Sequence, residues 1–291
     1  MLIYNPKDWF SIIFQFHKSD TFRKLAPLIA VITVYSLLVA YWEIEYLHLS
    51  SQSWVKNIPV MHNLLGFAIS MLLVFRTNTA YDRWWEGRKQ WGSLVNASRS
   101  FALKLDAMLD RGDVSAREFF KKMIPMYAVA LKDHLQSEQT RFMLDEKEHA
   151  EFYIDVKKHI PVQIAGLMIK RVNLLYHQKK LTGEQLILIN TEITTFTDVC
   201  GACERIKNTP IPYSYSAFIK KFIFIYVMTL PFGFVFSLGY YVAPMVAFVM
   251  YVLVSLELIA EEIEDPFGND VNDLPMSKIA SNIKKTIDEI L

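Results

Sequence analysis

The chain has 291 residues and a formal net charge of +1, so it lacks the basic excess that is typical of nucleic-acid-binding proteins. Hydrophobic residues make up 52% of the sequence and the mean hydropathy is +0.19, which is high for a soluble protein and low for one that lies wholly in lipid. A membrane part joined to a soluble part fits this composition.

The N-terminal segment is expected in the cytosol or at the membrane interface. It contains Lys7 and Asp8 and no uninterrupted apolar core, so no signal peptide is indicated. The aromatic stretch Trp9–Phe16 is typical of a short interfacial helix and equally of an ordinary packing helix.

Four apolar segments predict transmembrane helices. They are Leu25–Tyr41, Ile58–Phe75, Phe222–Tyr240 and Val242–Ala260. The predicted organisation is an N-terminal segment, a first pair of spans, a helical cytosolic domain, a second pair of spans and a cytosolic C-terminal segment: 1–24, 25–76, 77–218, 219–262 and 263–291.

The distribution of Lys and Arg predicts the orientation. Basic residues precede the first and third spans and follow the second, whereas the loop Trp42–Asn57 carries only Lys56. By the positive-inside rule, both termini and the central region face the cytoplasm of a cell with the chain in its inner membrane. Glu43 and Glu45 then lie in an outer loop, where they attract cations if they line an entrance.

The second span is predicted to continue into the cytosol as one helix. The run Ile58–Phe75 measures roughly 27 Å at about 1.5 Å per residue, close to the ~30 Å hydrocarbon core. Arg76 marks the membrane exit, yet no Gly or Pro follows before Gly87. Trp84 lies about 12 Å beyond Arg76, too far out for an interfacial belt, so a packed cytosolic domain is expected around it.

The central region reads as helices. Ser115–Glu118 and Thr182–Gln185 match the capping-box pattern. Cys200 and Cys203 form a Cys-x-x-Cys pair, but a redox dithiol needs a strand–helix context, and this pair sits in a helical run. Small packing residues in a reducing cytosol are the favoured interpretation.

A stripe of side chains in the second span is the candidate pore lining. Asn63, Phe67, Met71 and Phe75 are four residues apart and therefore share one face of the helix. In an oligomer with this face inward, they form a polar mouth above stacked apolar rings, which gate by dewetting. Periodicity alone leaves open the alternative that the stripe packs against another helix of the same chain.

An acidic cluster follows the fourth span: Glu261, Glu262, Glu264, Asp265, Asp270 and Asp273. Carboxylates at the C-terminal end of a helix oppose its macrodipole, so a compensating cation is expected, either Lys or Arg from a neighbouring segment or a metal. The cluster lacks the ligand spacing of an EF-hand.

Three motifs carry a family resemblance. The first runs from Leu64-Leu-Gly-Phe67 to Arg83-Trp-Trp-Glu-Gly-Arg88, the second is Cys203-Glu-Arg-Ile-Lys-Asn-Thr-Pro-Ile-Pro-Tyr-Ser214, and the third is Glu261-Glu-Ile-Glu-Asp-Pro-Phe-Gly268. In this order they resemble the bacterial branch of the bestrophins over nearly the whole chain. The resemblance implies an all-α membrane protein that assembles as a homopentameric ion channel around one central pore.

The resemblance also implies roles for particular residues. Phe67, Met71 and Phe75 match the hydrophobic neck of the family, with Met71 a departure from the usual bulkier residue, and Asn63 lies at the outer mouth. A second, cytosolic constriction is expected at Leu186 or Ile189.

A calcium site is a further implication of the resemblance, from the eukaryotic branch. Glu262, Asp265, Asp270 and Asp273 match its clasp, but Glu262 and Asp265 stand where amides are usual, so calcium gating transfers poorly. No cofactor is required, and the candidate is a divalent cation such as calcium.

The predicted function is a channel for small monovalent inorganic ions, with no enzyme activity. The bacterial branch favours sodium or other cations, whereas the family label is chloride and anions. The expected partners are four further copies of the chain, membrane lipid and the permeant ions, without nucleic acid. The alternatives are a membrane-bound dithiol oxidoreductase that uses Cys200 and Cys203, and a non-conducting membrane scaffold.

Overall fold

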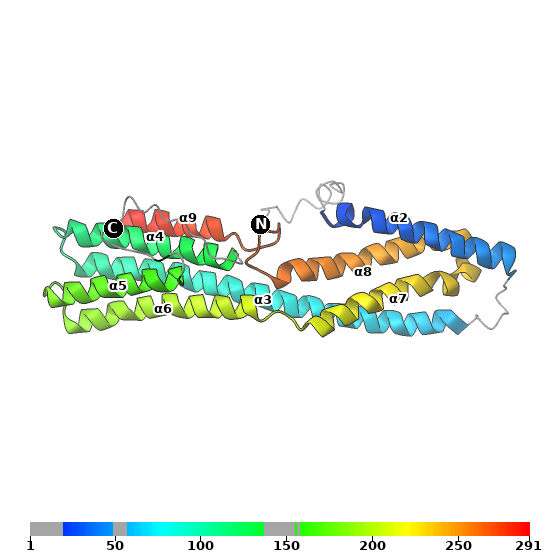
Figure 1. The fold of residues 1–291 in the computed structure, drawn as a ribbon, viewed down its shortest axis with the longest axis horizontal. Coiled ribbons are helices and arrows are strands. Elements are labelled where there is room, and N and C mark those ends of the chain that lie inside the picture. The colour runs from blue at the N-terminus through cyan, green and yellow to red at the C-terminus, as the bar shows by residue number, and fades with distance from the viewer. Residues whose placement is uncertain (1–19, 49–56, 137–154, 156–157) are drawn as a thin grey trace. The chain divides into compact units, whose positions relative to one another are not determined.

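The computed structural model of the chain describes residues 20–48, 57–136, 155 and 158–291, and these are 87% helical with no strand among them (Figure 1). The interfacial stretch Trp9–Phe16 lies outside the described residues. The elements, in chain order, are α2 (Asp20–Tyr41), a π-helical turn η2 (Trp42–Tyr46), α3 (Ile58–Met108), α4 (Val114–Gln136), α5 (Ile160–His177), α6 (Gly183–Asn208), α7 (Tyr213–Leu238), a 3-10 turn η5 (Gly239–Tyr241), α8 (Val242–Glu264) and α9 (Met276–Ile290).

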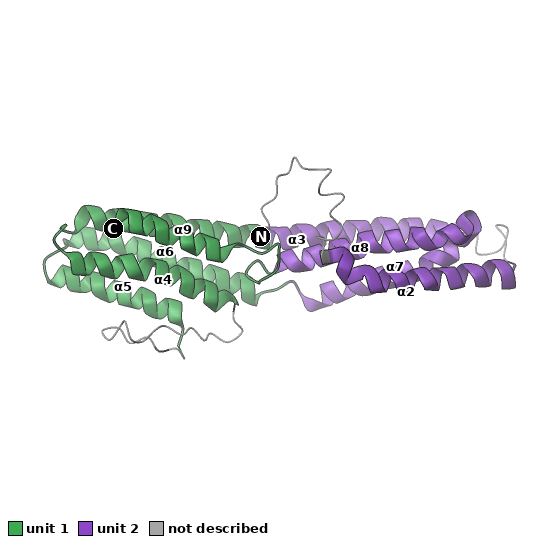
Figure 2. Ribbon diagram, turned by 90° about the horizontal axis from the view of Figure 1, so that it is seen from above, with its two compact units in different colours: residues 1, 83–210, 265–291 green, residues 2–82, 211–264 purple. Residues whose placement is uncertain are grey.

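The chain divides into two compact units (Figure 2). One contains residues 83–210 and 265–291, and the other contains residues 2–82 and 211–264. The unit boundaries differ by several residues from the predicted segment boundaries, because packing rather than hydropathy defines the units.

The apolar unit, 2–82 with 211–264, is built from α2, the first part of α3, α7 and α8. Helix α2 packs along α8, and α7 pairs with α8 as a hairpin. Buried side chains such as Ile69, Leu73, Val227 and Val246 form its core. The aliphatic and aromatic side chains around this core remain largely outward-facing, as in a protein surrounded by lipid.

Three stretches of the described chain are long and apolar enough to cross a membrane: Thr21–Tyr46, Ile58–Met108 and Tyr213–Glu264. The last is divided near its middle by Gly239, whose positive φ of 56° ends α7 and leads into η5.

The other unit, 83–210 with 265–291, is a helical bundle. Helix α4 packs on α5 and α9, and α5 packs on α6. Trp91 of α3 is fully buried in its core, and the Tyr127 hydroxyl donates a 2.6 Å hydrogen bond to the carbonyl of Phe196. The C-terminal helix α9 supplies Ile283 and Ile287 to the same core.

Helix α3 is a single helix of 51 residues, which confirms its predicted continuity through Arg76 and Trp84. Gly87, in the interior of this helix, allows a close approach of another segment. A Cβ there would lie 3.1 Å from the Phe267 ring and 3.2 Å from Pro266, so a larger residue would displace the loop that follows α8. Trp84 holds the same loop, because its indole N–H donates a 3.0 Å hydrogen bond to the carbonyl of Asn272.

One of the two predicted capping boxes is confirmed. At the start of α6, Thr182 and Gln185 exchange side-chain and backbone hydrogen bonds. The box predicted at Ser115 is wrong, because α4 already begins at Val114 and Asp113 accepts the N–H of Ala116 at 3.3 Å. The hydrogen bond from Lys180 lowers the pKa of Asp113, which keeps this cap ionised.

Candidate functional site

The predicted pore stripe lies on an exposed face of α3. Phe67, Met71 and Phe75 are 73%, 50% and 52% exposed, and Asn63 is exposed as well. Among the described residues, therefore, no helix of this chain covers the stripe. Aromatic side chains left half exposed in a row are typical of an interface or a lumen rather than of a protomer core.

The opposite face of α3 holds the helix in the apolar unit. Ile69 and Leu73 are buried in the core, and His62 is buried against α7, where its Nε2 lies 3.1 Å from the hydroxyl oxygen of Thr229. His62 and Asn63 are adjacent polar residues in an apolar segment. The structure separates them, with His62 in the protein interior and Asn63 on the exposed stripe.

A buried charge network lies directly after the stripe. The Arg76 guanidinium is 2.6 Å from Glu264 Oε2 and 3.5 Å from Glu257 Oε1, and Arg76 and Glu257 are almost fully buried. Glu264 also accepts a 2.7 Å hydrogen bond from the backbone N–H of Ile211. Because buried charges are costly unless paired, this network joins α3 to α8.

Sequence reasoning missed the role of Arg76, which it interpreted only as the membrane exit. The signal was present, because Glu257 is an acidic residue inside the apolar run Val242–Ala260. An ionisable residue in such a run points to a partner of opposite charge.

The residues predicted to form a cytosolic constriction, Leu186 and Ile189, do not lie on the exposed face of α6. Ile189 is fully buried and Leu186 is half-buried against the helical core. The exposed apolar side chains on this turn of α6 are Ile187 and Leu188. Ile189 therefore does not face a pore in this protomer, because its side chain lies in the core, and the position of a cytosolic constriction stays a prediction.

Basic side chains from neighbouring segments compensate the acidic cluster at the end of α8. Lys220 is 3.0 Å from Glu261, Lys24 is 3.2 Å from Glu262, and Arg76 binds Glu264. Of the two alternatives that the sequence predicted, a basic side chain or a metal ion, the structure shows basic side chains. Calcium binding by Glu262, Asp265, Asp270 and Asp273 stays a prediction.

Two acidic residues were expected to attract cations at an outer entrance. Glu43, in η2, is buried, so it does not present its charge to solvent in the protomer. Glu45 accepts a 3.4 Å hydrogen bond from the Tyr240 hydroxyl at an exposed position. Of the two, only Glu45 fits the expected role.

The motif Arg83–Arg88 has a structural role at the start of the helical bundle. The Arg83 guanidinium donates to the carbonyls of Ile206, at 2.6 Å, and Thr209. These carbonyls lie at the C-terminal end of α6, where a cation complements the helix dipole. Glu86 pairs with Lys89 and Gln90 on the surface of α3.

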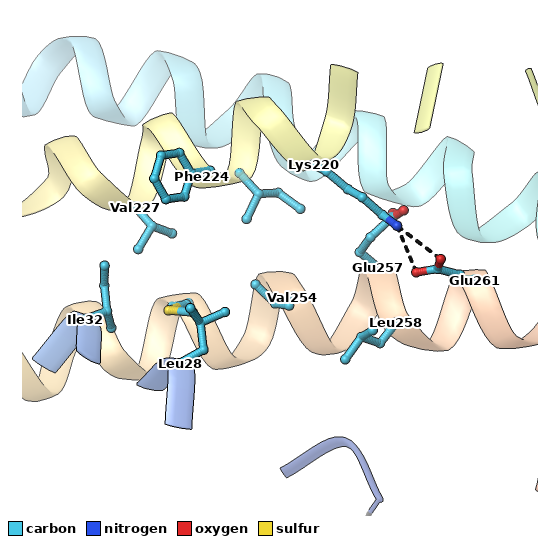
Figure 3. Close-up of a pocket in the computed structure, with 11 residues that line it drawn as sticks. Leu28, Ile32, Lys220, Phe224, Val227, Val254, Glu257, Leu258 and Glu261 are labelled. Atoms are coloured by element: carbon cyan, nitrogen blue, oxygen red, sulfur yellow. Dashed lines mark hydrogen bonds and ion pairs between the residues drawn. The ribbon is translucent and has the colours of Figure 1, made fainter. Parts of the chain in front are cut away.

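A cavity of about 250 Å³ opens between α2, α7 and α8 (Figure 3). Apolar side chains such as Leu28, Phe224 and Val227 form its walls, and the Lys220–Glu261 ion pair lies at one end. The charged residues of its lining are Lys220, Glu257 and Glu261.

The two cysteines are poorly suited to redox chemistry. Cys200 and Cys203 are free thiols buried in the helical core. Burial raises the pKa of Cys200 to about 12 and also raises the pKa of Cys203. Because the thiolate is the reactive form, both thiols are expected to be inert at neutral pH.

We therefore expect iodoacetamide at pH 8 to leave both cysteines of the native protein unmodified. With a pKa of about 12, Cys200 is only about one part in ten thousand thiolate at this pH. Mass spectrometry after a short exposure should find label only when the protein is first denatured. Rapid labelling of both thiols in the native protein would instead favour the dithiol oxidoreductase.

Comparison with known proteins identifies the family of the chain. The model of the Bacterial/Fungal Bestrophin protein family matches residues 1–289. The chain belongs to the bestrophin family. The three motifs that suggested it thus form part of a match along almost the entire sequence.

Curated relatives of this bestrophin carry channel names. A voltage-dependent anion channel-forming protein of Nostoc sp. is 34% identical over 98% of this chain and 92% of its own length. A protein of the same name from Synechocystis sp. is 30% identical over 99% of this chain and 93% of its own length.

Solved structures have the same fold. A variant of the bacterial bestrophin homologue from Klebsiella pneumoniae is 25% identical, with a TM-score of 0.79 over 92% of this chain and 98% of that chain. Another crystal structure of that homologue is 25% identical, with a TM-score of 0.77 over 90% of this chain and 96% of that chain.

Proposed function

We propose that this bestrophin assembles as a homopentamer and conducts small monovalent inorganic ions through a central pore lined by α3. The exposed stripe of Phe67, Met71 and Phe75 carries this proposal, because it follows one face of a membrane-length helix. With the stripe inward, five copies make three apolar rings below a ring of Asn63. Such a constriction passes ions only when it is widened or hydrated.

The proposed membrane part has four spans in each subunit. Helices α2, α3, α7 and α8 supply them, with α7 and α8 joined only by the turn η5. The channel names of the relatives support a transport role over catalysis.

The stripe itself carries no charge, so it discriminates by hydration and not by the sign of the ion. We propose sodium or another monovalent cation as the permeant ion, as the resemblance to the bacterial branch implies. The relatives from Nostoc and Synechocystis are named for anions, which makes chloride the competing candidate.

Currents in planar bilayers test the channel proposal. With a tenfold NaCl gradient across a membrane that contains the purified protein, a cation channel reverses near the sodium potential, about 59 mV from zero for a tenfold ratio of a monovalent ion. Reversal at the chloride potential would overturn the cation assignment and retain the channel. A protein that inserts as a pentamer without current would be the non-conducting scaffold.

We propose that both termini and the helical bundle face the cytoplasm of the inner membrane. A cysteine introduced at Tyr241 should then react with an impermeant maleimide added outside intact cells. This residue is exposed and lies in η5, directly after the C-terminal end of α7. A cysteine at Arg111, in the exposed turn between α3 and α4, should react only after the cells are opened. The reverse pattern of labelling would invert the topology. The buried native cysteines keep the background low.

A further inference from the structure

Two histidines from separate segments converge on one carboxylate in the helical bundle. His134 lies in the last turn of α4, His159 is the N-cap of α5, and Glu204 lies in α6. The Nε2 atoms of His134 and His159 are 2.6 Å and 2.5 Å from the same oxygen, Glu204 Oε1. The two imidazole rings are 4.4 Å apart.

This trio is distinctive within the described chain. It is the one group of three or more His, Cys, Asp or Glu side chains there whose potential ligand atoms all lie within 4.8 Å of one another. All three side chains are half-buried, so the cluster is held by packing and still open to an ion from solvent. The acidic residues after α8 do not form such a group.

The protonation states in the cluster also suit a metal. Burial lowers the pKa of His134, which favours its neutral form. Burial opposes ionisation of Glu204, but the hydrogen bonds from His159 and His134 outweigh it and lower the pKa of this carboxyl. Metal ligation requires neutral imidazole and an ionised carboxylate, and the shifts of His134 and Glu204 favour these forms.

We propose that His134, His159 and Glu204 bind a zinc ion, with water as the fourth ligand. Two imidazoles and one carboxylate are a ligand set that zinc takes in open tetrahedral sites, whereas calcium and magnesium select oxygen ligands. At zinc–ligand distances of about 2.0 to 2.1 Å, tetrahedral ligand atoms lie roughly 3.3 Å apart. The ligand atoms must therefore separate from the observed 2.5 and 2.6 Å, a change that small rotations of half-buried side chains supply.

Zinc binding changes the hydrogen bonding of His159. Its Nδ1 accepts a 3.3 Å hydrogen bond from the backbone N–H of Val162, so the ring proton is on Nε2. Ligation through Nε2 moves this proton to Nδ1 and removes the cap. Nearby, Lys207 donates to the carbonyl of Leu135 at 2.6 Å, and its charge is the local feature that opposes a cation.

A metal at this position ties together three elements. His134 and His159 border residues 135–158, so a shared ion closes this stretch of chain and anchors both of its ends to α6. Closing a loop by a metal stabilises the folded state relative to the unfolded chain. The expected consequence is a bundle whose stability depends on zinc.

Thermal unfolding of the full-length protein in detergent, after treatment with EDTA, tests the proposal. Adding zinc chloride at a large excess over the dissociation constant should raise the Tm by roughly 5 °C or more. Elemental analysis after gel filtration should find one zinc per chain. No retained zinc and no shift would show that the trio is only a hydrogen-bonded cluster.

Variants locate the ion. Glu204→Gln should abolish both the bound zinc and the shift, and His159→Asn, which preserves an N-cap side chain, should do so even if the first variant folds poorly. His177→Gln, at an exposed position in the last turn of α5, should retain both. Equal zinc binding in all three variants would place the metal elsewhere and overturn the assignment.

Calcium provides the comparison with the acidic cluster. If calcium binds there, its thermal shift should disappear in Asp270→Asn with Asp273→Asn and persist in Glu204→Gln. Loss of the zinc shift in the Asp270→Asn, Asp273→Asn protein would contradict a site at His134, His159 and Glu204.

Discussion

Replacing both Phe67 and Phe75 with alanine is expected to increase the current through the channel by about tenfold or more. Each phenylalanine is more than half exposed on α3, so in the proposed pentamer its ring narrows and dries the pore. Smaller side chains admit water, and every ~1.4 kcal/mol removed from the barrier raises the rate of ion passage tenfold. Single-channel recording should find a larger conductance or open probability, with an unchanged elution volume for the oligomer.

The matched control lies on the other face of the same helix. Leu73 is buried in the apolar core, and Leu73→Ala should cost about 2 to 5 kcal/mol through the lost packing and the cavity. We expect this variant to express or assemble poorly without a gain in conductance. If the Phe67 and Phe75 replacements reduce assembly to the same extent, the exposed stripe is a subunit contact and another face lines the pore.

Arg76→Ala is expected to destabilise the protein strongly. The side chains of Arg76 and Glu257 are only 2% and 4% exposed, and that of Glu264 is 13% exposed. Removing the cation leaves the buried carboxylate of Glu257 and the partly buried carboxylate of Glu264 unpaired with Arg76, and breaking a buried ion pair in this way costs on the order of 3 to 5 kcal/mol. A large fall in Tm and in the yield of intact oligomer should follow, because the lost network joins α3 to α8.

Lys220→Ala is the control for this prediction. Lys220 pairs with Glu261 at 3.0 Å, but both side chains are about half exposed, so the pair is worth within about 1 kcal/mol. The Tm of the Lys220→Ala protein should stay close to that of the wild type. An equal fall in Tm in Arg76→Ala and Lys220→Ala would mean that burial does not govern the strength of these ion pairs.

The helical class and the continuity of α3 could be predicted from the sequence because both depend on local pattern. From Arg76 to Glu86 no Gly or Pro interrupts the chain, so backbone hydrogen bonding continues from the apolar segment into the bundle. The four-residue spacing of Phe67, Met71 and Phe75 likewise places them on one face wherever the helix lies. These features need no knowledge of the rest of the fold.

Only the tertiary structure decided which face of each helix is covered. Periodicity did not distinguish Ile189, which is buried, from Ile187, which is exposed, because both are isoleucines on the same turn of α6. The helices that pack against α6 make this choice, with α5 as its main partner. The sequence of α6 alone does not specify that partner.

The same reason applies to the two polar clusters of the molecule. Arg76 lies 181 residues before Glu257, and Glu204 lies 70 residues after His134, so no local spacing relates the partners. The amino-acid sequence by itself determined the helices, the membrane segments and the stripe, because these follow from intrahelical geometry. Packing between helices determined the buried ion pairs and the convergence of His134, His159 and Glu204, because a charged or ligating group acquires its role only from what the fold brings beside it.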